Sequence, residues 1–327
     1  MLERLAGNDA LKAELGTALR GGRLPHAVLL VGEPGCGAGF AARCLAADYL
    51  YPAGGPHAEA VLKKEDTECL VLQGEGASGQ IPVKKVREAR EAIQRSALST
   101  DAAGRVLFIY GAQNLNGSSA NAMLKIIEEP PEGVLFLLTA TSAATVLPTI
   151  RSRCAAYTIA PVPAADCAAR LKAERLLAKA AEELAFLYEG HIGTALKSWN
   201  DPTAKAALGM AKTLCGYAAQ GDTYRALALL TKYERDKDGF AALLWTLDQL
   251  CSAVLRRPAY GQEQCGGLTP AGAAKILNAD ARARKSLTGN GNLRLNVAVL
   301  AGRLREKAFP EGEAALHASG VPPLQQC

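Results

Sequence analysis

The chain has 327 residues, of which 49% are apolar and 21% are charged, and its formal net charge at pH 7 is +5. This length allows two or three domains with sizeable cores, and the mildly basic charge permits contact with nucleic acid without arguing for it. No apolar run approaches the roughly 18 residues that a membrane span needs, and the N-terminus is charged, so we expect no membrane span, no signal peptide and a cytoplasmic location.

The nine cysteines have no repeating spacing. In a cytosolic chain this favours small buried thiols over a disulfide framework. A structural zinc site needs four ligands, usually in closely spaced pairs. Only Cys44, His57 and Cys69 provide soft ligands in the region from 44 to 69. We therefore predict no metal site.

A predicted helix over residues 9–21 precedes a predicted strand over 28–31, which leads into the loop GEPGCGAG at 32–39 and a helix over 40–49. Strand, glycine-rich loop and helix are the setting of a P-loop, whose backbone N–H groups surround phosphates at a helix N-terminus. The residues of this loop that matter for nucleotide binding are Gly32, Gly35, Gly37, Ala38 and Gly39.

The loop keeps the glycine spacing of a P-loop without its chemistry. In the pattern G-x-x-x-x-G-K-[ST], Ala38 stands at the lysine position and Gly39 at the position of the Mg²⁺-binding hydroxyl. No side chain there would meet the β- and γ-phosphates. A tight turn kept for helix–strand packing explains the loop better than ATP hydrolysis does, and also better than nucleotide binding. We therefore predict no bound cofactor.

The middle of the domain repeats the pattern of strands and helices. We expect residues 50–69 to be irregular, a short buried strand over 70–72, a helix from 83 to about 98, and a buried strand over 106–110. In a P-loop ATPase such a strand ends in an aspartate that holds Mg²⁺, often followed by a glutamate. Here Tyr110 and Gly111 occupy those positions, so a second part of an ATPase site is missing.

A helix over 118–129, ended by two prolines, and a strand over 134–138 complete this part. Buried strands separated by helices predict a parallel, doubly wound α/β domain.

The segment TIRSRC follows at 149–154. A solvated basic turn is the plain interpretation of two arginines around a serine. A guanidinium group is nevertheless suited to the charge that spreads over a transferring phosphoryl group.

The second half of the chain is predicted to be helical. Pro161 and Pro163 mark a first boundary, and residues 200–202 form a plausible second linker. Breaks are expected at 221–222, near 257–258 and at 289–291. The predicted core residues of a late helix are Leu293, Leu295, Val297, Leu300 and Leu304. The whole chain is thus predicted to be α/β and then all-α.

Three motifs, in matching order and spacing, resemble those of clamp-loader ATPase subunits, which are AAA+ proteins. Residues 121–131 (NAMLKIIEEPP) are similar to N-A-L-L-K-x-L-E-E-P-P, residues 147–154 (LPTIRSRC) to L-x-x-T-I-x-S-R-C, and residues 23–27 (RLPHA) to the segment before the P-loop. The resemblance covers roughly the first half of the chain. It implies a RecA-like AAA+ domain at 1–160, a helical lid at 161–200 and a helical collar (oligomerisation) domain at 201–327.

The resemblance also implies a function. Members with degenerate nucleotide motifs keep the AAA+ fold without hydrolysing ATP and serve in the clamp loader of bacterial DNA polymerase III. The resemblance then implies that Arg153 reaches into the ATP site of a neighbouring subunit. Ser152 and Cys154 would be positioning residues. The implied partners are clamp-loader ATPase subunits, the clamp-opening subunit, the sliding clamp and, through the complex, primer-template DNA.

Two features depart from the family. Many relatives carry a four-cysteine zinc module after the P-loop helix, and this chain lacks one. In catalytic relatives an arginine lies in a G-x-x-R-x-A-L segment of the lid, where this chain has Gly193. Two alternatives stay open: a self-sufficient AAA+ ATPase with an unusual P-loop, and a scaffold subunit that supplies no arginine.

Overall fold

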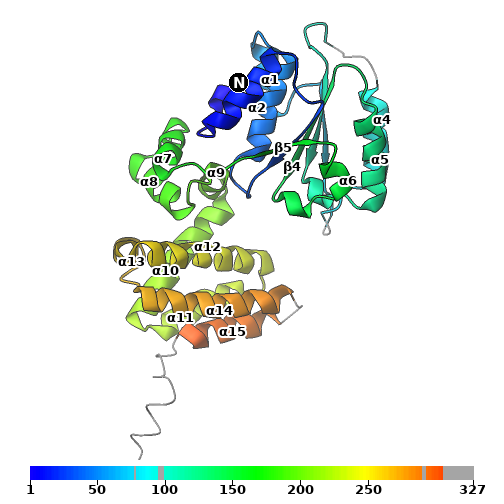
Figure 1. Ribbon diagram of the computed structural model, residues 1–327. Coiled ribbons are helices and arrows are strands. Elements are labelled where there is room, and N and C mark those ends of the chain that lie inside the picture. Colours follow the sequence, from blue (N-terminus) through cyan, green and yellow to red (C-terminus); the bar gives the residue numbers. More distant parts are fainter. Residues whose placement is uncertain (77–78, 95–98, 289–291, 305–327) are drawn as a thin grey trace, which may run out of the picture. The chain divides into compact units, whose positions relative to one another are not determined.

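The computed structural model describes residues 1–76, 79–94, 99–288 and 292–304. The chain forms two compact units, residues 1–196 and 197–327. Unit 1 contains a sheet with helices on both faces, and the described part of unit 2 is helical (Figure 1), which confirms the predicted order of α/β and then all-α. Within the described ranges, no helix is long and apolar enough to cross a membrane.

Unit 1 is built on a five-stranded parallel sheet with the order β2-β3-β4-β1-β5. The strands are β1 (Ala27–Val31), β2 (Cys69–Gln73), β3 (Arg105–Tyr110), β4 (Val134–Ala140) and β5 (Ala155–Thr158). Leu29 of β1 lies opposite Leu138 of β4 on one side and Ala156 of β5 on the other. Because all strands run in the same direction, the segments that follow β1, β3 and β4 lie at one edge of the sheet.

The helices of unit 1 include those predicted between the strands and others that were not predicted. They are η1 (Leu2–Arg4), α1 (Asp9–Arg20), α2 (Ala38–Leu50), α3 (Pro56–Lys63), α4 (Val83–Ile93), η2 (Ala112–Asn114), α5 (Gly117–Glu128), η3 (Ala143–Thr145), α6 (Pro148–Arg151), α7 (Ala164–Ala173), α8 (Ala178–Leu187) and α9 (Ile192–Asn200), the last crossing the boundary between the units. Sequence-local signals set their ends: Asn116 caps α5 by accepting the Ser119 N–H at 2.9 Å.

Alternation along the strands divides the core between the two faces of the sheet. Val28 and Leu30 of β1 pack with α1 and α2, whereas Ala27 and Leu29 pack with α4 and α5. Figure 1 shows these two helix pairs on opposite sides of the sheet. Burial on both faces is the reason that the strands are nearly continuous apolar runs and were recognisable in the sequence.

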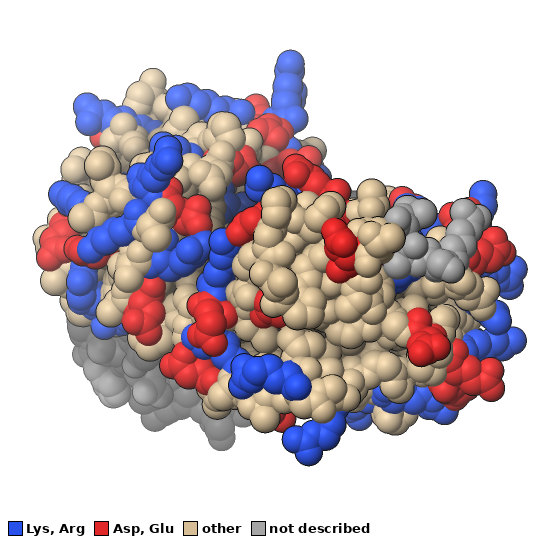
Figure 2. All heavy atoms as spheres, turned by 90° about the horizontal axis from the view of Figure 1, so that it is seen from above, with Lys and Arg blue, Asp and Glu red and all other residues tan. Residues whose placement is uncertain are grey.

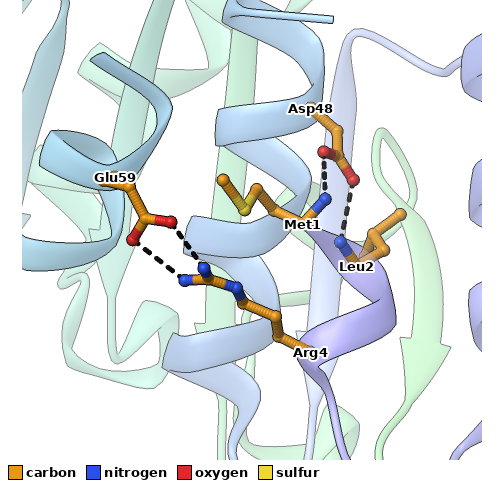
Figure 3. Close-up of polar contacts among 5 residues, drawn as sticks. All are labelled: Met1, Leu2, Arg4, Asp48 and Glu59. Carbon is orange, nitrogen blue, oxygen red and sulfur yellow. Dashed lines mark hydrogen bonds and ion pairs between the residues drawn. The ribbon is translucent and has the colours of Figure 1, made fainter. Parts of the chain in front are cut away.

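The first residues of the chain are tied to the helices of one face (Figure 3). The Leu2 N–H donates to the Asp48 carboxylate at 2.8 Å, and the amino group of Met1 donates to the same carboxylate. Arg4 donates from both terminal nitrogens to Glu59, at 2.9 and 2.5 Å. Asp48 belongs to α2 and Glu59 to α3, so η1 is held against both helices.

Three predictions about local structure were wrong in part. Residues 50–69 were expected to be irregular, but glycine at 55 and proline at 56 start helix α3. Strand β2 was expected to be buried, but it is the edge strand of the sheet, and Val71 is 45% exposed. Strand β5, at the other edge, and the short helix α6 were not predicted. Residues 95–98, where the predicted α4 helix continued, lie outside the described residues.

Unit 2 is a bundle of helices. They are α10 (Pro202–Gln220), α11 (Thr223–Leu230), η4 (Thr231–Tyr233), α12 (Lys237–Arg256), α13 (Pro258–Gln264), α14 (Pro270–Thr288) and α15 (Leu293–Leu304). Helix α12 packs against α10 and α14, and α15 packs against α11 and α14. The predicted breaks at 221–222 and 257–258 are confirmed, and the break at 289–291 lies outside the described residues.

The predicted core of the late helix is confirmed at two positions and wrong at one. Val297 and Leu300 of α15 are buried, whereas Leu295 is 63% exposed. Six of the eight described cysteines are buried, as expected of small hydrophobic residues, and the described cysteines form no disulfide with one another. Residues 161–196, most of the predicted lid, belong to unit 1. The finer division into RecA-like domain, lid and collar stays a prediction.

A buried ion pair supports the outer strands of the sheet. Glu68, fully buried, lies 3.3 Å from the Nε of Arg105, and its other carboxylate oxygen accepts the Ser99 N–H at 2.7 Å. Arg105 also donates to the Ala92 carbonyl at 2.5 Å, at the end of α4. The pair therefore connects the segments before β2 and β3 with α4.

We expect Glu68→Ala to destabilise unit 1 by about 3–5 kcal/mol, because it leaves the Arg105 charge buried without its carboxylate. Glu65→Ala, which removes an exposed carboxylate three residues away, should change stability by less than about 0.5 kcal/mol. Hydrogen exchange of the β3 amides measures the effect within unit 1. Equal protection in the two variants would contradict the assignment.

A second buried carboxyl lies in unit 2. Asp280 of α14 is 1% exposed and pairs with the Nε of Arg284 at 2.7 Å. Arg284 also donates to the Leu244 carbonyl at 2.9 Å and lies 3.5 Å from Asp248 of α12. Burial raises the pKa of Asp280 to about 7, against the opposing attraction of Arg284.

Because the folded pKa of Asp280 exceeds its unfolded value of about 3.9, this carboxyl stabilises unit 2 fully below about pH 4, and its contribution is lost as the pH rises through about 7. We expect Asp280→Asn to reduce the loss of stability between pH 5 and pH 8. Both tryptophans, Trp199 and Trp245, lie in unit 2, so tryptophan fluorescence during urea unfolding reports on this unit. Asp238→Asn, at an exposed site on α12, is the control. An unchanged pH dependence in Asp280→Asn would contradict the prediction.

Candidate functional site: a degenerate P-loop and a supported arginine

The glycine-rich loop has the backbone shape of a P-loop. It follows β1, and Gly37 at φ 100° starts α2 as its N-terminal cap. Gly35, at φ 94°, also has a positive φ, which side chains with a Cβ rarely adopt. A pocket of 380 Å³ lies over the loop and reaches Gly111 after β3, Thr139 at the end of β4, and Gly193. The predicted P-loop and strand-end positions are therefore brought together at one edge of the sheet.

Tyr110 takes up room beside the position of the missing hydroxyl. Its ring lies 3.5 Å from where a Cβ on Gly39 would stand. The amino group of Lys64 lies 5.7 Å from the centre of this ring, and Arg43 of α2 lines the same pocket. Burial raises the pKa of the Tyr110 hydroxyl, so it stays neutral near pH 7. A divalent cation here would meet an aromatic ring and nearby positive charges.

The start of α9 lies directly on the P-loop within unit 1. The Gly193 N–H donates to the Gly35 carbonyl at 2.8 Å, and the Thr194 hydroxyl donates to the Pro34 carbonyl at 3.3 Å. The Nε2 of His191 lies 3.0 Å from the carboxylate of Glu33. The absence of a side chain at position 193 eases this approach, since a Cβ there would make a tight contact of 3.1 Å with the Gly35 carbonyl oxygen.

Sequence reasoning treated Gly193 only as a missing arginine. In the structure, the backbone of Gly193 itself contacts the loop, through the hydrogen bond from its N–H to the Gly35 carbonyl. The contacts of His191 with Glu33 and of Thr194 with the loop were not predicted. No sequence signal identifies these contacts, because Glu33 and His191 are 158 residues apart and meet only in the folded unit.

Arg153 follows α6 and is 38% exposed. Its Nε and Nη2 lie 2.7 and 2.6 Å from the same carboxylate oxygen of Glu128. Its Nη1 donates to the Thr149 carbonyl at 3.1 Å and to the Ser152 hydroxyl at 3.3 Å. The guanidinium is thus supported by its own unit without being buried in it.

The residues around Arg153 differ in what they contact. Ser152 caps the end of α6 and donates to the Thr149 carbonyl at 3.2 Å. Cys154 packs against the core of the sheet, and burial raises the pKa of its thiol to about 12. Arg151 donates to the Ala143 carbonyl at 3.1 Å. Within the described part of the chain, Arg153 pairs with a carboxylate and Arg151 does not.

The three motifs noted in the sequence meet in space. His26, from the segment before β1, has its Nε2 2.9 Å from the Ile127 carbonyl near the end of α5. The next residue of α5, Glu128, pairs with Arg153. The sequence analysis quoted Glu128 within a motif and gave it no role. Its separation from Arg153 by 25 residues hides the contact.

Two further predictions concern metal binding and the charge of the surface. Among the described residues, no cluster of three or more His, Cys, Asp and Glu side chains could hold a metal ion. On the face shown in Figure 2, Lys and Arg side chains are interspersed with Asp and Glu side chains, next to an uncharged region. The net charge of +5 therefore does not by itself mark a nucleic-acid surface on that face.

Curated relatives are subunits of replication complexes. The chain is 33% identical over 165 residues to the DNA polymerase III subunit gamma/tau of Mycobacterium bovis, a match covering 49% of this chain and 28% of that protein. It is 29% identical over 210 residues to the DNA polymerase III subunit delta' of Escherichia coli, covering 64% of this chain and 57% of that subunit. The chain thus spans between about a quarter and three fifths of the length of these relatives.

Among solved structures, a gamma subunit-related protein from Thermotoga maritima aligns with 89% of this chain and 98% of its own length, at 17% identity and a TM-score of 0.48. The family model described as "DNA polymerase III, delta subunit" matches residues 7–163. These residues contain the sheet, the P-loop and Arg153. Residues 7–163 are thus similar to the DNA polymerase III delta-subunit family, and a DNA polymerase III subunit delta' is among the proteins that the chain resembles.

Proposed function

We propose that this chain is a non-catalytic clamp-loader subunit that assists ATP-dependent loading of the sliding clamp onto primed DNA. In this role Arg153 enters the ATP site of a neighbouring ATPase subunit. The observation that carries the proposal is the contrast between two parts of unit 1. Arg153 is partly exposed and is held by Glu128. The chain's own P-loop, in contrast, has Ala38 and Gly39 at the positions of the lysine and the hydroxyl, and the Tyr110 ring lies beside it.

The chemistry fits an arginine that acts in trans. Phosphoryl transfer develops charge on the transferred group, and catalysis depends largely on positioned positive charge. Arg153 provides a planar, permanently charged group with several donors. The partners in this proposal are clamp-loader ATPase subunits, the clamp-opening subunit and the sliding clamp, with primer-template DNA bound through the complex. The relatives named above support this set, since they are DNA polymerase III subunits.

Both alternatives have less support. A self-sufficient ATPase would need a lysine and a metal-binding hydroxyl in the loop, where this chain has Ala38 and Gly39. A scaffold without a trans-acting arginine would be favoured if Arg153 were buried against its own unit, but it is 38% exposed.

We expect Arg153→Ala to lower ATP turnover by the assembled complex on the order of 10³-fold, because the partner's site loses a charge that stabilises the transition state. Turnover is measured with the partner ATPase subunits, clamp and primed DNA. Arg151→Ala is the matched control, because its guanidinium donates to the Ala143 carbonyl, and it should stay near the wild-type rate. Unchanged turnover in Arg153→Ala, with assembly intact, would refute the role in trans.

The purified chain alone is expected not to hydrolyse ATP above the uncatalysed background. The double substitution Ala38→Lys and Gly39→Thr should not create activity, since Tyr110 still stands at the position of the Mg²⁺-binding aspartate. Phosphate release at millimolar ATP and Mg²⁺ measures both proteins. Wild-type turnover that disappears when Gly37 is replaced would instead establish a self-sufficient ATPase.

A further inference from the structure

We propose that Glu128 is a positioning residue for Arg153: it holds the guanidinium so that its terminal edge faces outward to receive a phosphoryl group. This inference rests on the proposed function in trans. The carboxylate itself does not touch the nucleotide in this account and acts only through the arginine.

The contacts hold the guanidinium along its side edge and at Nη1. Arginine has five N–H donors arranged around a plane. Glu128 occupies the side edge, since Nε and Nη2 both lie within 2.7 Å of one of its oxygens. The terminal edge, made by Nη1 and Nη2, is the one that can receive two oxygens of a phosphate.

The terminal edge needs only one exchange to become a two-donor fork. Nη1 uses its two N–H groups on the Thr149 carbonyl at 3.1 Å and the Ser152 hydroxyl at 3.3 Å. One Nη2–H remains after the contact with Glu128. An incoming phosphate oxygen that replaces the Nη1 contact on the terminal edge completes the fork, while Glu128 and the other Nη1 contact keep hold of the plane.

Both supports stand on packed elements. Glu128 is the last residue of α5, whose Met123, Ile126 and Ile127 are buried in the sheet core. Thr149 belongs to α6, whose Ile150 is buried in the same core. Because both anchors are fixed, the long arginine side chain has less rotational freedom to lose when a phosphate binds.

The pair is too exposed to be explained by stability alone. Glu128 is 47% exposed and Arg153 is 38% exposed, and ion pairs at such positions contribute little to folding. A carboxylate at the C-terminal end of a helix is also unfavourable for the helix dipole. Orientation of the arginine is the role that these contacts support.

The test uses the reconstituted complex of full-length chain, partner ATPase subunits, clamp and primed DNA, with kcat and KM for ATP as readouts. We expect Glu128→Ala to lower kcat roughly 10- to 100-fold with KM within about twofold, since misplacement of a positioned group costs on that scale. Glu128→Gln should recover most of the loss, because its amide oxygen still accepts from Nε and Nη2. Glu129→Ala, which removes the exposed neighbouring carboxylate, should behave as wild type.

The double variant Glu128→Ala/Arg153→Ala decides whether Glu128 acts through Arg153. We expect it to be no slower than Arg153→Ala alone. Additive losses, or a wild-type rate in Glu128→Ala while Arg153→Ala is impaired, would overturn the inference and leave the proposed function standing. A wild-type rate in Arg153→Ala would overturn both. Co-elution with the partner subunits confirms that each variant folds and assembles.

Discussion

Burial of the parallel sheet on both faces is the constraint on which unit 1 depends. Alternate residues of β1, β3 and β4 enter the cores on the two faces, so a shift of register by one residue would exchange the two sets of side chains. This fixed register brings the ends of three strands to one edge of the sheet. The P-loop after β1, Tyr110 at the end of β3 and the segment after β4 are positioned there together.

At that edge, residues of the protein contact the glycine-rich loop at positions where a nucleotide-binding protein would have side chains that contact the ligand. The backbone at Gly193 bonds to Gly35, and the Tyr110 ring lies next to Gly39. A Cβ on Gly193 would lie 3.1 Å from the Gly35 carbonyl oxygen, which is tight, whereas a Cβ on Gly39 would lie at the ordinary contact distance of 3.5 Å from the Tyr110 ring. The glycine at position 193 thus allows the backbone of α9 to lie close to the loop.

The position of Arg153 depends on two helices that pack on the sheet. Its guanidinium is held by a residue at the end of α5 and by the end of α6, two elements anchored in the same core. His26 contacts the end of α5 as well. Three segments that carry the family resemblance thus form one connected support, and the position of the arginine follows from the packing of the sheet rather than from the local sequence TIRSRC.

The sequence by itself determined the strands β1, β3 and β4, the helices between them, the absence of the P-loop lysine and the presence of Arg153, because alternation, glycine spacing and residue identity are local properties. It did not determine α3, where a short amphipathic segment is too brief to be distinctive, or the edge position of β2. Only the tertiary structure decided that Glu128 supports Arg153, that α9 lies on the P-loop and that Tyr110 stands beside Gly39. These contacts join residues 25 to 158 positions apart. The P-loop contacts form at the edge where β1 and β3 end, whereas Glu128 and Arg153 meet at the edge where β4 and β5 begin, so both depend on the folded sheet.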